Sequence, residues 1–542
     1  MGATADGPGA IAPAPPDHQE VELKLSVPPE TVSRLRRHPL LTGLARNTRR
    51  LDSTYFDSPD LALLKRNLSL RVRKLGRRHV QTLKEGPLLQ AGLFKRKEIE
   101  QLVGGDHPDP ARIDDPDLRD VVERVGRKQG LQPIFGTSFR RTSWRITVGE
   151  HTAVQATLDV GEVRAGAATE PVCELELELE RGDAADLIGL ARRLCRDLPL
   201  GLGGRSKAAI GYALYNGEAA AELAPRRIAL AEDATTGEAA LAVVDWCLRE
   251  IVAHQPIALD GTDPEGVHQV RVATRRLRSA LGVFGPLFEP APLAALSDEL
   301  RWLMGELAEA REWDVFLTEM LPPVEATFEG DGRARWRRDM GRIADHARQL
   351  RDEGYGRVRA ALAHERYFNL VISLRLWIDR PPWHADAWLP EPATATPPPG
   401  FAAPRREEPM VEFARRALEH RHRRVRKLGR RADALELAEL HRLRIRMKKL
   451  RYLAEFARAL FDKQAAKPYL KAAARAQESL GHLNDTATVH RLIAALKQRD
   501  DDPALDLVYG RIEGWFAALA AEGRRNAAPL MKGFLKTERF WS

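Results

Sequence analysis

Charged residues alternate with apolar residues in several short stretches of the sequence. In the first stretch, Glu20, Glu22 and Lys24 alternate with three apolar residues. Side chains of a β-strand point to opposite faces in turn, so each stretch predicts a strand with one charged and one apolar face. Later stretches repeat this pattern with Arg71 and Arg73; Thr82 and Lys84; Glu98 and Glu100; Arg141, Ser143 and Arg145; and Glu174, Glu176 and Glu178. Many strands therefore supply carboxylates and cations together.

These residue types suit the chemistry of a metal-bound polyanion. Glutamate and aspartate oxygens suit Mg²⁺ or Mn²⁺, whereas Arg and Lys match phosphate oxygens. Phosphoryl transfer depends mostly on positioning and on neutralising the transferred group, while a metal holds or activates a water molecule. No Walker loop is evident: Gly201 to Gly204 precedes Ser206 and Lys207 without that spacing, which indicates a flexible turn. Lys207 could still reach a terminal phosphate.

Two arrangements of the strands fit the pattern. In an open antiparallel sheet the charges would face water, which is the common case for a single strand. In a closed sheet of about eight strands they would line an interior for side chains or one small ligand, provided that helices cover the apolar outside. Buried charges there would have to pair with each other, a metal or a ligand. Amphipathic segments that predict such helices lie near Glu30 to Leu44, Asp117 to Lys128 and Asp183 to Leu198. We therefore expect an α+β domain with a closed, eight-stranded antiparallel β-tunnel.

Length and composition narrow the class of protein. The chain has 542 residues, a formal net charge of +9 and a pI near 9.5, which predict two or three domains and an anionic partner. Cys173, Cys195 and Cys247 form no CxxC pair or zinc-type cluster, which favours a reducing cytoplasm. Residues 1–16, rich in Ala, Pro and Gly, predict a disordered tail, and no long apolar run predicts a membrane span.

The second half of the sequence predicts helices. After a domain over 17–215 and a linker over 216–233, residues 234–542 are rich in Leu, Ala, Arg and Glu with helical periodicity. The Pro-rich segment 381–408 joins two portions, 234–380 and 409–542. His268 to Arg278 aligns with His441 to Arg451 without a gap, at an offset of 441 − 268 = 173. This repeat predicts an all-α helical bundle with internal two-fold symmetry.

A basic stripe follows one helix of each repeat. Helical spacing places His268, Arg271, Arg275 and Arg278 on one face, and His441, Arg444, Lys448 and Arg451 on the matching face of the copy. A solvated face explains one such helix, but its repetition favours binding of a long phosphate polymer that neutralises the stripe. Both histidines fit helix packing as well as phosphate contact. Nucleic acid is disfavoured, because aromatic residues are only 6% of the chain and none interleaves with the stripes.

The N-terminal motifs, taken in order, resemble the CYTH family of triphosphate tunnel metalloenzymes over residues 17 to 215. They are Glu20-Val-Glu22-Leu-Lys24, Tyr55-Phe-Asp57, Arg71-Val-Arg73, Lys84, Glu174-Leu-Glu176-Leu-Glu178 and Ser206-Lys207. The resemblance implies metal ligands among Glu20, Glu22, Asp159, Glu174, Glu176 and Glu178. It implies triphosphate contacts from Lys24, Arg71, Arg73, Lys84, Arg141 and Lys207, with Glu20, Glu22 and Lys24 as catalytic residues. Glu98 and Glu100 are expected as further tunnel carboxylates.

The second half resembles the CHAD domain, a helical module named for its recurring histidines and associated with inorganic polyphosphate. The match is strongest at His268 to Leu281, Arg311 to Leu317 and His441 to Tyr452. A CYTH domain followed by a CHAD domain is a bacterial arrangement that favours inorganic triphosphate as the substrate. We therefore expect a Mg²⁺- or Mn²⁺-dependent inorganic triphosphatase, cytoplasmic or associated with polyphosphate granules. The alternatives are a non-catalytic polyphosphate-binding scaffold and a CYTH enzyme that acts on thiamine triphosphate or cyclises ATP.

Overall fold

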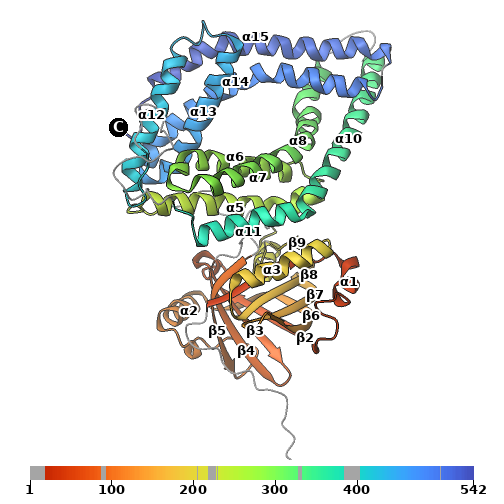
Figure 1. Ribbon diagram of the computed structural model, residues 1–542, viewed down its shortest axis with the longest axis vertical. Helices are drawn as coiled ribbons and strands as arrows, with labels where there is room; N and C mark the ends of the chain where they lie inside the picture. The colour runs from red at the N-terminus through yellow and green to blue at the C-terminus, as the bar shows by residue number, and fades with distance from the viewer. Residues whose placement is uncertain are drawn as a thin grey trace, which may run out of the picture. The chain divides into compact units, whose positions relative to one another are not determined.

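The computed structural model describes residues 19–86, 93–203, 205–217, 228, 230–327, 333–383, 403–500 and 502–542. The chain divides into two compact units, an N-terminal α+β unit and a C-terminal all-α unit, shown in Figure 1. The predicted tail 1–16 and most of the predicted linker 216–233 and of the Pro-rich segment 381–408 lie outside the described residues. The predicted fold class is confirmed for both units.

An antiparallel sheet of nine strands forms the first unit. The strands follow the order β5-β4-β3-β2-β6-β7-β8-β1-β9, and β1 also pairs with β5. That pairing, from Gln19 to Leu23, connects the two ends of the eight-strand order, so β1 to β8 close into a tunnel. The strands are β1 (Gln19–Ser26), β2 (Arg46–Asp57), β3 (Leu68–Leu75), β4 (Arg78–Glu85), β5 (Leu93–Val103), β6 (Gln132–Val148), β7 (Thr152–Ala165), β8 (Ala168–Arg181) and β9 (Gly201–Leu202).

Helices cover the apolar outer face of the tunnel. Leu70 and Leu83 pack in one buried cluster with Val122 and Val125 of α2 (Pro116–Gln129). The helix α3 (Ala184–Asp197) lies across β1 and β8 and buries Leu187, among others (Figure 1). Both helices begin at an Asp cap, whose side chain accepts a hydrogen bond from the first turn. This outside cover leaves the opposite, charged faces of the strands to line the interior.

Two short elements differ from the sequence-based expectation. The segment near Glu30 to Leu44 forms only the 3₁₀ turn η1 (Pro29–Thr31) and α1 (Val32–Arg36). Its helix ends before Pro39, because a proline disfavours helical geometry in the residue before it. The predicted flexible turn after Pro199 is wrong as well, since Gly201 and Leu202 form β9 against Leu25 and Ser26 of β1.

One helix of this unit was missing from the expectation. The helix α4 (Lys207–Asn216) begins at Ser206, whose Oγ accepts a hydrogen bond from the Ala209 amide at 3.1 Å. The residues from Lys207 to Ala213, at the start of the helix, are buried. A Cβ at Gly211 would overlap the ring of Phe135. Because α4 packs this closely against β6, it fixes Lys207 at the sheet.

The second unit consists of helices. They are α5 (Thr236–Asp260), α6 (Glu265–Phe284), α7 (Pro290–Glu306), α8 (Ala308–Val315), α9 (Leu321–Ala326), α10 (Arg333–Ala363), α11 (Glu365–Asp379), α12 (Met410–Gly429), α13 (Leu437–Ala457), α14 (Lys463–Lys497) and α15 (Asp506–Lys536). In Figure 1, α5 and α6 lie side by side, as do α12 with α13 and α14 with α15. The repeat helices α6 and α13 also contact each other.

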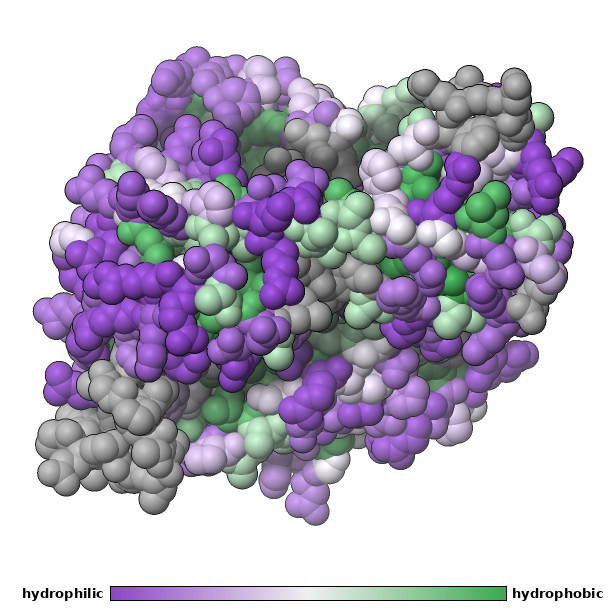
Figure 2. All heavy atoms as spheres, turned by 90° about the horizontal axis from the view of Figure 1, so that it is seen from above, coloured by the Kyte–Doolittle hydropathy of each residue, from purple (hydrophilic) through white to green (hydrophobic). Residues whose placement is uncertain are grey.

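The face seen from above is mainly polar. In the view from above, hydrophilic residues cover most of the molecule and hydrophobic residues show only in small areas among them (Figure 2). Large exposed hydrophobic residues such as Ile445 and Leu507 are scattered, which is ordinary for a protein surface. Among the described helices, none has the length and apolar character needed to cross a membrane.

Candidate active site in the tunnel

Glu176 of β8 is the centre of a buried ionic cluster. Its carboxylate accepts hydrogen bonds from Lys24, from Lys207 at 2.9 Å and from Arg141 Nη2 at 2.7 Å. Burial works against the charged carboxyl, but Lys207, Lys24 and Arg141 outweigh it and hold the pKa of Glu176 well below its ordinary value. The three cations come from β1, α4 and β6, so this cluster forms only in the folded tunnel.

Asp159 and Glu174 complete the cluster. Arg141 donates two hydrogen bonds to Asp159, from Nε at 2.7 Å and from Nη2 at 2.5 Å, and Lys207 lies 2.7 Å from the same carboxylate. Lys207 also binds Glu174. Burial raises the pKa of Glu174 despite the nearby Lys207 and Lys24. Carboxylate oxygens of Asp159, Glu174 and Glu176 lie within 4.8 Å of one another.

A second acidic pair lies next to this cluster. Glu22 of β1 stands directly opposite Glu178 of β8, and Lys24 Nζ is 3.3 Å from Glu22. Burial and then the charge of Glu22 raise the pKa of Glu178 to about 7. Like charges directly opposite in a sheet repel, so a cation held between these carboxylates would be stabilising.

Arg71 and Arg73 project from β3 into the same interior. Arg71 lies 3.4 Å from Glu98 and 3.7 Å from Glu100. Arg73 donates from Nε to Ser53 Oγ at 3.1 Å and forms no ion pair with any described residue. Burial, followed by the charges of Arg71 and Arg141, lowers the pKa of Arg73 to about 9. Arg73 is thus a half-buried cation that has no ion-pair partner among the described residues.

The remaining predicted tunnel residues form a rim. Lys84 Nζ lies 2.7 Å from Glu98, which stands opposite it across β4 and β5. Glu100 accepts a hydrogen bond from Thr82 at 2.9 Å, and its side chain is half exposed. Glu20 lies in β1, but its side chain is outside the described residues. The expected roles of all these residues as ligands or catalysts stay predictions.

Several neighbours were not predicted as site residues. Tyr55 stands opposite Arg71 across β2 and β3 and stacks on Phe135 at 4.4 Å. Burial raises the pKa of Tyr55, but Arg71, Arg73 and Lys207 together outweigh it and lower the pKa. Arg49 stands opposite Arg141 across β2 and β6 and is exposed at the mouth. Strand alternation places Arg49, Leu51, Ser53 and Tyr55 on one face of β2. Because these residues are of mixed types, they did not form a recognisable charged face in the sequence.

The residues present fit a divalent cation. Five carboxylates, from Glu22, Asp159, Glu174, Glu176 and Glu178, offer hard oxygen ligands on one interior wall. Asp159, Glu174 and Glu176 also hold Lys24, Arg141 and Lys207, and Glu22 shares Lys24, whereas Glu178 has no ion pair with a described residue. A cation would therefore be bound best where the second pair adjoins the cluster.

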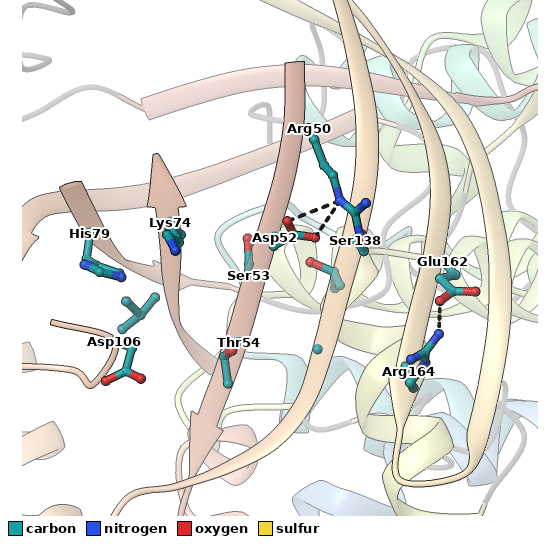
Figure 3. A pocket seen from close by; sticks show the side chains of 13 residues that line it. Arg50, Asp52, Ser53, Thr54, Lys74, His79, Asp106, Ser138, Glu162 and Arg164 are labelled. Carbon is teal, nitrogen blue, oxygen red and sulfur yellow. Dashed lines mark hydrogen bonds and ion pairs between the residues drawn. The ribbon is translucent and has the colours of Figure 1, made fainter. Parts of the chain in front are cut away.

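A separate cavity lies outside the tunnel. It has a volume of about 460 Å³ and is lined mainly by residues of β2, β3, β6 and β7, together with His79 of β4 and Asp106 (Figure 3). Arg50 there contacts Asp52 at 3.3 Å and Ser138 at 3.1 Å, and Arg164 pairs with Glu162. Arg50 and Arg164 are thus already paired with carboxylates of their own strands. For this reason the cavity is a weaker candidate for an anion site than the tunnel.

In the helical unit, basic residues of the two repeats meet. Lys448 of α13 lies close to the charges of Arg444 and Arg451 on its own helix and of Arg275 on α6. Burial, followed by the charges of Arg444, Arg275 and Arg451, lowers the pKa of Lys448 to about 8. The middle parts of the two stripes, at Arg275 and Lys448, therefore meet at the α6–α13 contact.

Other stripe residues differ in their surroundings. Arg271 donates to the Met304 carbonyl at 2.8 Å, and Arg451 lies 3.5 Å from Glu455. Burial, followed by the nearby Arg311, lowers the pKa of His268, while His441 and Arg278 are exposed. Arg271 and His268 are thus partly used in packing.

The closed sheet with an ionic interior, followed by helices with a repeated basic face, defines a two-domain class. A CYTH domain model matches residues 18–212, and a CHAD domain model matches residues 242–494. The chain is a CYTH-CHAD protein, with a CYTH domain followed by a CHAD domain.

Relatives match different parts of the chain. It is 32% identical over 200 residues to an inorganic triphosphatase of Haemophilus influenzae, an alignment that covers 36% of this chain and 55% of that protein, so it spans about half of the relative's length. It is 29% identical over 478 residues to an uncharacterized protein of Mycobacterium tuberculosis, covering 82% of this chain and 83% of that one.

Two solved structures are also similar. The CHAD domain from the plant Ricinus communis is 29% identical with a TM-score of 0.47, covering 58% of this chain and 98% of that chain. A Hippeastrum protein described as a putative adenylyl cyclase with a dominant triphosphatase activity is 22% identical with a TM-score of 0.28, covering 37% and 96%.

Proposed function

We propose that the tunnel hydrolyses inorganic triphosphate to diphosphate and phosphate with the help of Mg²⁺ or Mn²⁺. The observation that carries this proposal is the half-buried Arg73, which has no ion-pair partner among the described residues and lies in the same tunnel as the carboxylates of Asp159, Glu174 and Glu176. A chain of phosphates with a divalent cation supplies negative charge to the arginines and positive charge to the carboxylates. The CYTH domain and the triphosphatase relative support this reaction class.

The cations and the carboxylates of the tunnel have different roles in this proposal. Arg71 and Arg73 bind phosphate oxygens, because a guanidinium group can donate two parallel hydrogen bonds to a phosphate. Lys24, Lys207 and Arg141, already held by Glu176, neutralise charge that develops on the departing phosphates. Glu22, Asp159, Glu174, Glu176 and Glu178 would hold the divalent cation. When bound, that cation would supply positive charge for the triphosphate and would activate a water molecule.

The tunnel proposal is tested with purified full-length protein. Phosphate release is measured from tripolyphosphate, ATP, thiamine triphosphate and long polyphosphate, each with Mg²⁺, with Mn²⁺ and with a chelator. We expect the highest kcat/KM for tripolyphosphate. We expect no phosphate release from any of the compounds in the presence of the chelator. Cyclic AMP from ATP would indicate the cyclase alternative, and no turnover of any compound by folded protein would leave the scaffold alternative.

We further propose that the helical domain binds inorganic polyphosphate at the α6–α13 face. The convergence of Arg275, Arg444 and Lys448 supports it, because their mutual repulsion would be relieved by a polyanion. Binding of long polyphosphate to full-length protein in chelator is compared with binding to Lys448→Ala. Equal affinity of the two proteins, or tighter binding of RNA, would contradict this part of the proposal.

A further inference from the structure

Asp57 is a buried carboxylate that the proposed chemistry of the tunnel does not use. It is the last residue of β2 and of the Tyr55-Phe-Asp57 motif, and its side chain has no exposed surface. A buried carboxylate is strongly unfavourable unless hydrogen bonds or a cation satisfy its oxygens. The groups that contact Asp57 therefore show which parts of the fold it holds together.

Hydrogen bonds from two parts of the chain converge on this carboxylate. Its Oδ1 accepts from the Ser58 amide at 2.7 Å and from the Leu63 amide at 2.9 Å. Its Oδ2 accepts from the Leu64 amide at 2.9 Å and from the Tyr212 hydroxyl of α4 at 3.0 Å. Asp57 thus joins the connection between β2 and β3 to a helix that lies 155 residues later in the chain.

The backbone amides fix the connection from β2 to β3. Leu61, in this connection, has a φ of 57°, in the left-handed region that leucine rarely adopts. Such a conformation persists only where the surrounding contacts hold it, and the amides bound to Asp57 are such contacts. The connection leads directly into β3, which carries Arg71 and Arg73. Asp57 therefore fixes the start of the strand that supplies these two arginines.

The Tyr212 hydroxyl fixes α4, which carries Lys207. Tyr212 is fully buried, and its ring meets the Phe135 ring edge-on with 5.3 Å between the centroids. Lys207 precedes Tyr212 by five residues, which is about 7.5 Å along the helix. Since α4 packs mainly on β6, β7 and β8, the bond to Asp57 adds a link to β2 and to the start of β3.

We propose that the hydrogen bond between Asp57 and Tyr212 positions Lys207 at a fixed distance from the arginines of β3. Both are positioning residues, because they act through Lys207 and do not touch the substrate. An electrostatic contact to a reacting phosphate depends steeply on its placement, and a shift of about 1 Å can cost about 100-fold in rate. The effect on the reaction rests on the proposed triphosphate hydrolysis, whereas the placement of Lys207 can be measured without turnover.

The variant Tyr212→Phe tests this role, because it removes the hydroxyl and keeps the ring against Phe135. Asp57 keeps its backbone donors in this variant, so we expect the protein to fold. The matched control is Tyr469→Phe in α14, since Tyr469 is equally buried and its hydroxyl lies 2.9 Å from His422 Nδ1. For tripolyphosphate we expect kcat of Tyr212→Phe to fall about tenfold and KM to change by less than about twofold. The control should keep both constants.

Chemical modification of lysines gives a readout that does not depend on turnover. Lys207 and Lys24 are both buried and both bind Glu176, but only Lys207 lies on α4. Full-length wild-type protein and Tyr212→Phe are treated with acetic anhydride in chelator, and mass spectrometry measures how fast each lysine is modified. In Tyr212→Phe we expect Lys207 to be modified about tenfold faster and Lys24 at the wild-type rate.

The outcomes separate this inference from the function proposed above. Faster modification of Lys207 alone, in a protein that releases no phosphate, would support the positioning and contradict the triphosphatase. An active wild-type protein whose kcat and Lys207 modification are unchanged in Tyr212→Phe would contradict the positioning and leave the triphosphatase intact. Faster modification of Lys207 with an unchanged kcat would overturn its role in the reaction. Equal acceleration at Lys24 and Lys207, or an equal fall of kcat in Tyr469→Phe, would show a general loss of stability and would also overturn the inference.

Discussion

Glu22 and Glu178 stand directly opposite each other across β1 and β8. Burial and this proximity raise the pKa of Glu178 to about 7, so this carboxyl is half protonated near neutral pH. A divalent cation needs the carboxylate form and displaces the proton. We expect metal affinity to rise with pH below about 7, by at most about tenfold per pH unit, and to level off above it. Metal titrations by calorimetry across this range check the slope, and Glu178→Gln should flatten it; an unchanged slope would contradict the assignment.

Arg73 should be needed for binding the substrate and not for the stability of the protein. The substitution Arg73→Ala takes away a half-buried cation that Arg71 and Arg141 repel. We expect kcat/KM for tripolyphosphate to fall about 100-fold, while the free energy of unfolding stays the same or increases. Arg50→Ala, on the outer face, is the matched control and should keep full activity. Strong destabilisation by Arg73→Ala would show that its charge is compensated in the folded protein.

Glu176 should be needed both for the stability of the protein and for phosphate release. In Glu176→Gln, Lys24, Lys207 and Arg141 lose their shared counter-charge in a buried site. We expect a loss of about 3–5 kcal/mol in the free energy of unfolding together with loss of phosphate release. Denaturant unfolding and the tripolyphosphate assay measure the two effects. Glu100→Gln, at the half-exposed rim, should change stability by less than about 1 kcal/mol.

The packing of α4 should control the position of Lys207. A methyl group at Gly211 would overlap the Phe135 ring, so Gly211→Ala must displace the helix. We expect about 1–3 kcal/mol of destabilisation and a lower kcat. Gly189→Ala in α3 is the control, since a Cβ there meets no atom within 4 Å. Equal stability of the two variants would mean that α4 adapts without moving.

Polyphosphate binding should depend on pH through Lys448. Its pKa of about 8 means that the free protein loses this charge as the pH rises through 8, and a bound anion would raise the pKa again. Binding should therefore take up a proton and weaken above about pH 8. Calorimetry in buffers of different ionisation enthalpy measures the proton uptake. Lys448→Arg should keep the affinity and lose most of this pH dependence.

The sequence predicted which residues face the tunnel, because strand alternation fixes the face of each side chain. It did not predict which carboxylate would be central: Glu174, Glu176 and Glu178 are equivalent by alternation, and only the register with Lys24 and Arg141 distinguishes Glu176. The helix α4 was missed because its Ala- and Ile-rich turns are buried on nearly every side and show little amphipathic pattern.

The strand β1 carries Glu22 and Lys24 and also pairs with β5, β8 and β9. During synthesis it leaves the ribosome first among the described strands, yet its partners are made much later, and Lys207 follows the last of them. The newly made segment must therefore wait with its hydrogen-bonding edges unpaired. A truncated translation product that ends before α4 would be both inactive and prone to aggregate, so misfolding is most dangerous for this protein while it is still being translated.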